Sequence, residues 1–163
     1  MSEIINSVLQ ARYFTKDEQS WEDVCKRVSN FVGNTDEERE IFYNKMVEGK
    51  FIPNSPTLFN AGLPNGQLSA CFVLPIHDSM TSIFGTLGDC AQIFKSGGGC
   101  GFSFDELRQK NSPVGESNGV ASGAVSFMRV YDAAIESIKA GGRRRGAAMG
   151  VLPVNHGDIM DFV

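Results

Sequence analysis

The first fifty residues carry apolar positions at helical spacing. Beyond Ser20 these positions recur every three or four residues, at Trp21, Val24, Cys25, Val28, Phe31 and Val32. Ser20 with Asp23 has the spacing of a capping box, and Thr35 with Glu38 repeats that spacing ahead of a second apolar stripe that stops at Gly49. The pattern predicts two packed helices in a helical region of residues 1–50.

After residue 50 the pattern changes to short apolar runs that alternate with helical stretches. Three runs have the length of buried strands: ACFVLP, FSF and MGVLPV. Between them, apolar residues keep helical spacing over 80–96, after an N-cap at Asp78–Ser79, and over 124–140. Strand, helix, strand, helix, strand is the order of βαβ units, so residues 51–163 are expected to form an α/β domain with a parallel sheet. Because ligands of such sheets bind at the carboxyl ends of the strands, we expect the glycine-rich loops there.

A glycine-rich stretch, KSGGGCGF at 95–102, lies between the first helical stretch and the FSF run. Four glycines in five residues disfavour a regular helix or strand interior, so we expect a helix end and a turn, followed by a strand. Either the stretch is only a tight turn, or its bare backbone lets N–H groups contact an anion or a sugar. The string GGRRRG at 141–146 leaves a similar choice between a solvated charge cluster and a phosphate-binding loop.

The composition limits the functional classes. The chain has 163 residues, 42% of them hydrophobic, which is typical of a globular protein, and its net charge of −4 disfavours nucleic-acid binding. No apolar run is long enough to span a bilayer and no signal sequence opens the chain, so we expect a cytoplasmic protein that does not bind membranes. The four cysteines form no CxxC pair and have no histidine cluster, which predicts no metal site. We expect buried, apolar cysteines, with one reactive thiol as the alternative.

Seven strings beyond residue 50 occur together in one order: NSPTLFNAG, LSACFVLP, DSMTSIF, KSGGGCGFSF, GVASGAVSFM, GGRRRGAAM and HGDIMDF. In order and spacing they resemble the large catalytic chain of ribonucleotide reductase across residues 51–163, whereas residues 1–50 match only loosely. The SGGG-GFSF style most resembles the adenosylcobalamin-dependent (class II) branch, and some metal-radical branches share parts of it. The resemblance implies N-terminal helices followed by the first βα units of a reductase-type α/β barrel.

The resemblance implies a substrate site for a ribonucleotide. In this family the positions that match Ser55, Ala70, Cys71 and Gly99 hold the substrate, partly through backbone groups. Cys71 matches one of two cysteines that supply reducing equivalents in each turnover, and a dithiol suits a reduction that needs two electrons. A thioredoxin-like reductant would regenerate that dithiol.

The resemblance also implies a regulatory site. Asp78, Ser79 and Arg108 match the specificity site, where a deoxynucleoside triphosphate or ATP binds as effector, and Arg108 would take a phosphate. Arg144 lies in the string that matches the loop coupling effector to substrate choice. Two helical stretches, 80–96 and 124–140, would build a homodimer interface beside the effector.

Several parts of a reductase are missing from the sequence. The N-x-C-x-E pattern of the radical cysteine does not occur in the chain, nor do the partner of Cys71 and the shuttle cysteines. The resemblance therefore implies an N-terminal fragment or split subunit that works with the remaining reductase chain, and adenosylcobalamin as cofactor of the complete enzyme. The alternative is a non-catalytic module that binds dNTP and dimerises. A plain α/β domain is disfavoured, because seven ordered strings do not arise by chance.

Overall fold

The computed structural model describes residues 3–115, 119–138 and 147–163. It divides into two compact units, Met1–Ala70 and Cys71–Val163. The sequence-based boundary after residue 50 differs from this division by twenty residues. The reason is a short helix, Ser55–Asn60, whose Leu58 is buried in the core of the first unit together with Ala61.

The first unit is helical. Its elements are α1 (Glu3–Arg12), α2 (Trp21–Val32), α3 (Asp36–Val47) and α4 (Ser55–Asn60). The two predicted helices are α2 and α3, and both begin as the caps indicate. Ser20 and Asp23 form a capping box, and Thr35 accepts a hydrogen bond from the Glu38 amide. These two helices pack around a core that has six buried members: Val24, Cys25, Val28, Met46, Leu58 and Ala61.

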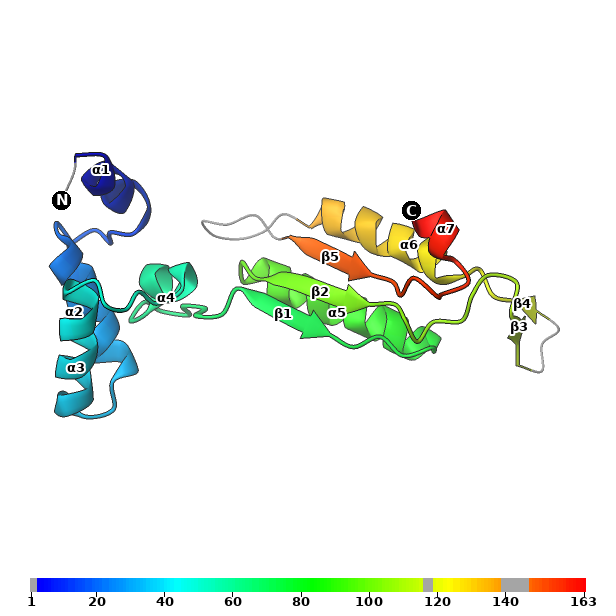
Figure 1. Cartoon of the computed structure of the whole chain (residues 1–163), viewed down its shortest axis with the longest axis horizontal. Coiled ribbons are helices and arrows are strands. Elements are labelled where there is room, and N and C mark those ends of the chain that lie inside the picture. Colours follow the sequence, from blue (N-terminus) through cyan, green and yellow to red (C-terminus); the bar gives the residue numbers. More distant parts are fainter. Residues whose placement is uncertain (1–2, 116–118, 139–146) are drawn as a thin grey trace. The chain divides into compact units, whose positions relative to one another are not determined.

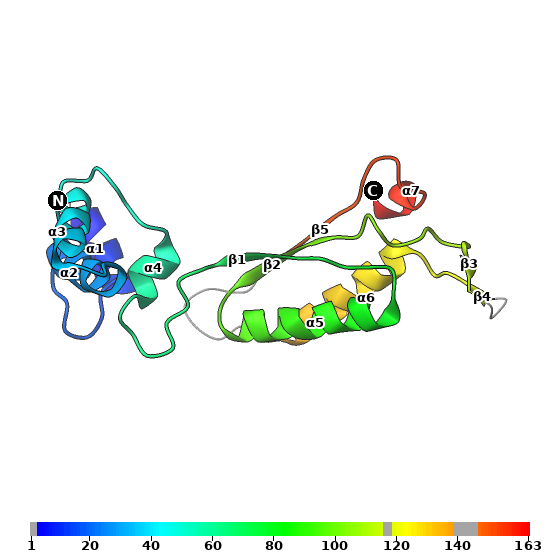
Figure 2. The same ribbon diagram turned by 90° about the horizontal axis from the view of Figure 1, so that it is seen from below.

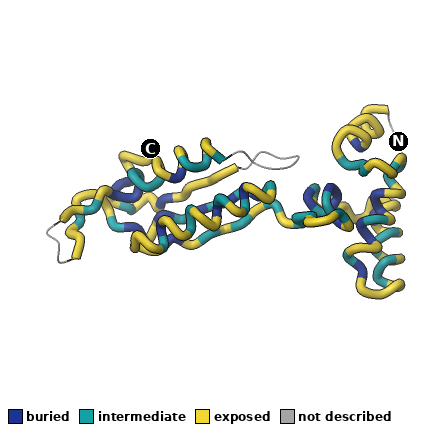
Figure 3. Tube along the Cα trace, turned by 180° about the vertical axis from the view of Figure 1, so that it is seen from behind, coloured by how far each residue is buried: buried dark blue, intermediate teal, exposed yellow. Residues whose placement is uncertain are grey.

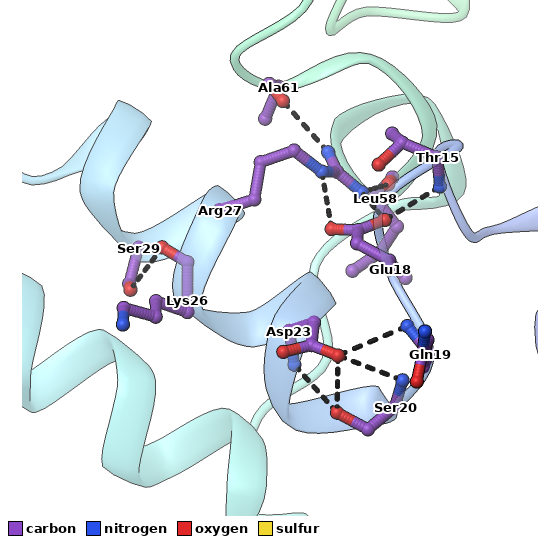
Figure 4. Close-up of polar contacts among 10 residues, drawn as sticks. All are labelled: Thr15, Glu18, Gln19, Ser20, Asp23, Lys26, Arg27, Ser29, Leu58 and Ala61. Atoms are coloured by element: carbon purple, nitrogen blue, oxygen red, sulfur yellow. Dashed lines mark hydrogen bonds and ion pairs between the residues drawn. The ribbon is translucent and has the colours of Figure 1, made fainter.

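Arg27 of α2 forms a buried ion pair with Glu18 and also connects α2 to the end of α4 (Figure 4). The Arg27 guanidinium donates to both carboxylate oxygens of Glu18, at 2.7 and 3.2 Å, and their side chains are only 15% and 8% exposed. Its remaining N–H groups donate to the carbonyls of Ala61 and Leu58, at 2.8 and 3.0 Å, where α4 ends. Glu18 also accepts from the Thr15 amide at 2.7 Å. One arginine thus supplies the cation for a buried carboxylate and donors for the C-terminal carbonyls of a helix, which have no partner within the helix.

The second unit contains a parallel sheet, as the sequence predicts (Figure 1). Its elements are β1 (Cys71–Leu74), α5 (Met80–Lys95), β2 (Gly99–Ser103), β3 (Pro113–Val114), β4 (Gly119–Val120), α6 (Ala124–Ser137), β5 (Ala148–Val151) and α7 (Ile159–Phe162). The strand order is β1-β2-β5. The antiparallel pair β3–β4 lies in a segment expected to be a polar loop. Among the residues described, no helix combines the length and apolar character needed to cross a bilayer.

The two faces of the sheet differ. Both α5 and α6 lie on one face (Figure 2), where Phe72 and Phe102 pack with Tyr131 of α6 in the core of the unit. The other face is open: Val73 is 84% exposed and Met149 is 64% exposed. Strand β5 is exposed along its whole length (Figure 3). Within the described sheet β1 and β5 are edge strands, so one face and two edges are available to other structure.

Candidate functional site

Cys71 and Gly99 lie side by side at the amino ends of β1 and β2. They are partner residues in the parallel register, and neighbouring strands are about 4.8 Å apart. Side chains alternate between the faces of a strand, so Cys71 shares the open face with Val73, while Phe72 points to the helices. The structure therefore brings an exposed thiol next to a backbone segment that has no side chain.

Cys71 differs from the other cysteines of the chain. Of the four, only Cys71 is exposed. Burial raises the pKa of the Cys25 and Cys90 thiols to about 12, and it also raises the pKa of Cys100. Because a thiolate is the reactive form, these three behave as apolar core residues. Three thiols are therefore buried as expected, and Cys71 is accessible, while its reactivity stays a prediction.

The glycine stretch is a helix end, a turn and the start of a strand, as predicted, but the strand already begins at Gly99. Gly97 has a φ of +87° directly after α5. A Cβ on Gly98 would lie 2.7 Å from the Ile93 side chain, and one on Gly99 would lie 2.8 Å from the carbonyl oxygen of Ala147. Packing inside the unit therefore already requires glycine at both positions, whether or not a ligand approaches.

One expectation about this stretch is wrong. The sequence predicts these glycines at the carboxyl ends of the strands, but Gly97 and Gly98 precede β2 and Gly99 is its first residue, paired with Cys71 at the amino ends. The carboxyl ends of β1 and β2 lead instead to the loops that carry Asp78 and Arg108. The two groups of candidate residues in the second unit therefore belong to opposite ends of the same strands.

Two other candidates for the substrate site belong to the first unit. Ser55 is the first residue of α4, and its hydroxyl lies 3.4 Å from the Tyr13 hydroxyl. Ala70 is the last residue of the unit and is half-buried. The helix itself was missed in the sequence because two prolines flank its start. Asn54 caps it, accepting from the Thr57 amide at 2.9 Å, and a proline in the first turn is compatible with such a helix.

The three effector candidates described by the structure line one cavity. Its volume is about 510 Å³, and its wall is formed by the loops after β1 and β2, the hairpin β3–β4, and the first turns of α5 and α6. Asp78, Ser79 and Arg108, together with Ser122, supply the polar side chains of the wall. Apolar side chains supply most of the rest: Met80, Ile83, Leu107, Val114, Val120 and Phe127. Arg144, the fourth effector candidate, lies outside the described residues.

Arg108 and Asp78 are held together in this cavity. The guanidinium Nε donates to Asp78 Oδ2 at 2.5 Å, and Nη1 donates to the Pro113 carbonyl at 3.1 Å. Their side chains are 37% and 32% exposed, so the pair is open to solvent from the cavity. Ser79 caps α5 and accepts from the Ser82 amide at 3.2 Å. A cavity with an apolar wall and an arginine at its rim suits a ligand that has both a flat apolar ring and phosphates.

The hairpin is the part of the cavity that sequence reasoning missed. Each of its strands has two residues, which is too short to show a periodic pattern. Among the described residues of this segment, Gly115 directly after Val114 indicates a turn, and its φ is +50°. The helices expected at 80–96 and 124–140 are α5 and α6, and Phe84 and Val130 on them are 46% and 40% exposed.

Comparison with known proteins accounts for both units. The all-alpha domain of ribonucleotide reductase matches residues 2–66, and the barrel domain of ribonucleotide reductase matches residues 69–163. The chain belongs to the ribonucleotide reductase family. In the sequence, the boundary between the two matched domains falls between residues 66 and 69, close to the division after Ala70.

Relatives of this reductase chain are several times longer. A vitamin B12-dependent ribonucleoside-diphosphate reductase of Thermoplasma acidophilum is 61% identical over 122 residues, which are 75% of this chain and 16% of that protein. A protein of the same name from Mycobacterium tuberculosis is 43% identical over 171 residues, covering 96% of this chain and 25% of that protein. The chain corresponds to an N-terminal part of the reductase large chain.

A solved structure confirms the fold class. The class Id ribonucleotide reductase alpha subunit of Actinobacillus ureae matches with a TM-score of 0.80 and 25% identity, over 99% of this chain and 29% of that one. The expected architecture of helices followed by the start of a reductase barrel is therefore confirmed.

Proposed function

We propose that this chain supplies the N-terminal part of a ribonucleotide reductase and one wall of its substrate site. The observation that carries the proposal is the pairing of Cys71 with Gly99 on the open face of the sheet. An accessible thiol beside bare backbone suits a sugar that must approach closely and be reduced. The relatives named above are ribonucleoside-diphosphate reductases, so we infer a ribonucleoside diphosphate as substrate.

The proposed chemistry uses Cys71 as one of two thiols. The 2′-hydroxyl leaves the ribose as water, and two thiols supply two electrons and two protons, becoming a disulfide. The second thiol and the radical-bearing cysteine belong to the remaining reductase chain, because the three other cysteines here are buried. A thioredoxin-like dithiol returns the disulfide to two thiols between turnovers.

The names of the B12-dependent relatives support adenosylcobalamin as cofactor of the complete enzyme. The residues that the structure describes do not form a site that fits it. Both histidines are already engaged: His77 Nδ1 lies 2.7 Å from the Glu106 carboxylate, and His156 Nε2 lies 2.7 Å from the Leu107 carbonyl. We therefore assign the cofactor to the rest of the enzyme.

The cavity at the carboxyl ends of β1 and β2 is the proposed effector site. A deoxynucleoside triphosphate or ATP would place its base against the apolar wall and a phosphate on Arg108, whose charge suits an anion. Asp78 would accept hydrogen bonds from the sugar or base. We also propose that Arg144 belongs to the loop that couples this site to substrate choice, and that α5 and α6 form a homodimer interface beside it.

A second candidate function is a regulatory module that binds dNTP and dimerises without catalysis. The cavity favours it, because residues of this chain form a cavity of about 510 Å³ with Arg108 in its wall, whereas the thiol chemistry needs a second cysteine from elsewhere. Calorimetric titration of the chain with dATP and dTTP, with and without the remaining reductase chain, separates the two functions. A catalytic subunit gives deoxyribonucleotide when that chain is present, whereas a regulatory module binds effector and gives none.

Substitution of Cys71 tests the catalytic role. In the reconstituted enzyme, Cys71→Ser should abolish multiple turnover with a dithiol reductant, because the alcohol cannot form a disulfide. Cys25→Ala is the matched control, since it removes a buried thiol from the core of the first unit and should leave turnover intact. Retained turnover in Cys71→Ser would refute the assignment.

A further inference from the structure

A buried carboxylate behind the cavity connects three segments of the second unit. Asp158 is only 6% exposed. Its Oδ1 accepts from the Lys110 amide at 2.9 Å, and its Oδ2 accepts from the Ala124 amide at 2.8 Å. Both partners are backbone groups, one in the loop after β2 and the other at the first residue of α6.

This carboxylate takes the place of the N-cap side chain that α6 lacks. The N-cap residue is Gly123, with a φ of +89°, and it offers no side-chain acceptor to the helix. Asp158, 34 residues further along the chain, supplies the acceptor and places a negative charge where the helix dipole is positive. A side chain on Gly123 would collide with this carboxylate, since its Cβ would lie 2.5 Å from Asp158 Oδ2.

His156 completes the connection. Its Nε2 lies 2.7 Å from the Leu107 carbonyl, and its Nδ1 accepts from the Asp158 amide at 3.1 Å. An imidazole with its proton on Nε2 satisfies both contacts at once. Two side chains of the segment after β5, those of His156 and Asp158, therefore bind backbone groups of Leu107, Lys110 and Ala124.

The contacted residues border the proposed effector cavity. Leu107, Arg108 and Gly123 line it, and Lys110 and Ala124 adjoin them in sequence. Asp158 does not line the cavity, so its effect on the cavity passes through the backbone of the segments that form the wall. We propose that Asp158 is a positioning residue that fixes the spacing between the Arg108 loop and the start of α6, and with it the shape of the cavity. The expected effect on ligand binding rests on the proposed effector function.

Two variants and a control test this inference on the chain. Asp158→Ala removes both acceptors, and Asp158→Asn keeps one of them in a side chain of the same size. Asp161→Asn is the control, because Asp161 is also acidic and close in sequence, but its side chain is 59% exposed and lies 3.8 Å from Lys110 Nζ. Amide hydrogen exchange is followed for the segments 107–115 and 119–127, and the affinity for dATP and dTTP is measured by calorimetry below the melting temperature.

The expected result is faster exchange in both segments for the Asp158 variants, with unchanged exchange in α2 and α3. Affinity should fall by about tenfold or more in Asp158→Ala, less in Asp158→Asn, and not in Asp161→Asn, because hydrogen bonds to a charged acceptor are among the strong ones. Unchanged exchange in both segments would overturn the inference, and so would wild-type affinity in Asp158→Ala. If the wild-type chain binds neither nucleotide, the effector proposal fails, and hydrogen exchange still decides whether Asp158 holds the wall.

Discussion

Replacing Arg27 by leucine should destabilise the first unit severely. The substitution leaves a shorter, apolar side chain and removes four hydrogen bonds, two to Glu18 and two to the carbonyls that end α4. The Glu18 carboxylate would then be 8% exposed without its cation, keeping only the Thr15 amide as a partner.

The burial of the Arg27–Glu18 pair determines how much stability the substitution should remove. Removing one partner of a buried ion pair costs about 3–5 kcal/mol, because the remaining charge stays desolvated. A unit of seventy residues, Met1–Ala70, has a typical stability of roughly 4–10 kcal/mol. The substitution therefore removes a large share of that stability, and the urea midpoint should fall by about 3–5 M if the slope is near 1 kcal/mol per M.

Trp21 provides the assay. It is the single tryptophan of the chain and belongs to α2, with its indole N–H donating to the Met46 carbonyl at 3.2 Å. Its fluorescence in a urea titration therefore reports on the first unit. Arg39→Leu is the matched control: Arg39 also pairs with an acid, Asp36, but the two side chains are 40% and 98% exposed, so the loss should stay below about 1 kcal/mol.

A double variant checks the proposed cause. Adding Glu18→Gln to Arg27→Leu removes the buried charge and still leaves an acceptor for the Thr15 amide, so part of the lost stability should return. If Arg27→Leu shifts the midpoint no further than Arg39→Leu does, or if the double variant is less stable than the single one, the reasoning from burial is wrong.

Three further predictions concern the second unit. Gly99→Ala should lower the melting temperature of this unit, because the added Cβ would lie 2.8 Å from a backbone carbonyl oxygen. Gly101→Ala on the same strand is the control and should have little effect, since the nearest atom to its added Cβ is 4.0 Å away. Equal shifts in the two variants would contradict this reasoning. Titration of the native chain with a thiol reagent should label Cys71 rapidly and the three buried cysteines only in denaturant, and more than one fast thiol would show that the core is open. Tyr131→Phe should cost about 1 kcal/mol in thermal unfolding, because it removes the buried hydrogen bond to the Ile83 carbonyl at 2.5 Å, and an unchanged melting temperature would count against that bond.

The parts of the fold that were predictable are those set by neighbours in sequence. Ser20, Thr35 and Ser79 each cap a helix through residues only three positions away, so their signals are local. The alternation of apolar runs with helical stretches was enough to predict the parallel sheet, because parallel strands need crossover connections. The gathering of Asp78 and Arg108 in one cavity also followed, once the resemblance had assigned both to one site.

The parts that were missed depend on residues far apart in sequence. The cap of α6 comes from Asp158, and no pattern near Gly123 indicates it. The need for glycine at position 99 comes from the backbone of Ala147, which directly precedes β5, whereas the sequence offered only a tight turn or a close approach by a ligand as reasons. The N-terminal unit extends past residue 50 because Leu58 returns to its core, and the prolines around that residue suggested a loop.

A change in the length of β1 would change which of its side chains lie on the open face. Successive residues of a strand face opposite sides, so deleting one residue between Cys71 and Leu74 would turn every later side chain of the strand over. Deleting Phe72 would turn Val73 toward the helices, and deleting Val73 would turn Leu74 toward the open face, or else the thiol itself would be turned toward α5. Single-residue insertions and deletions should therefore be rejected within this short strand, even where substitutions of similar size are accepted.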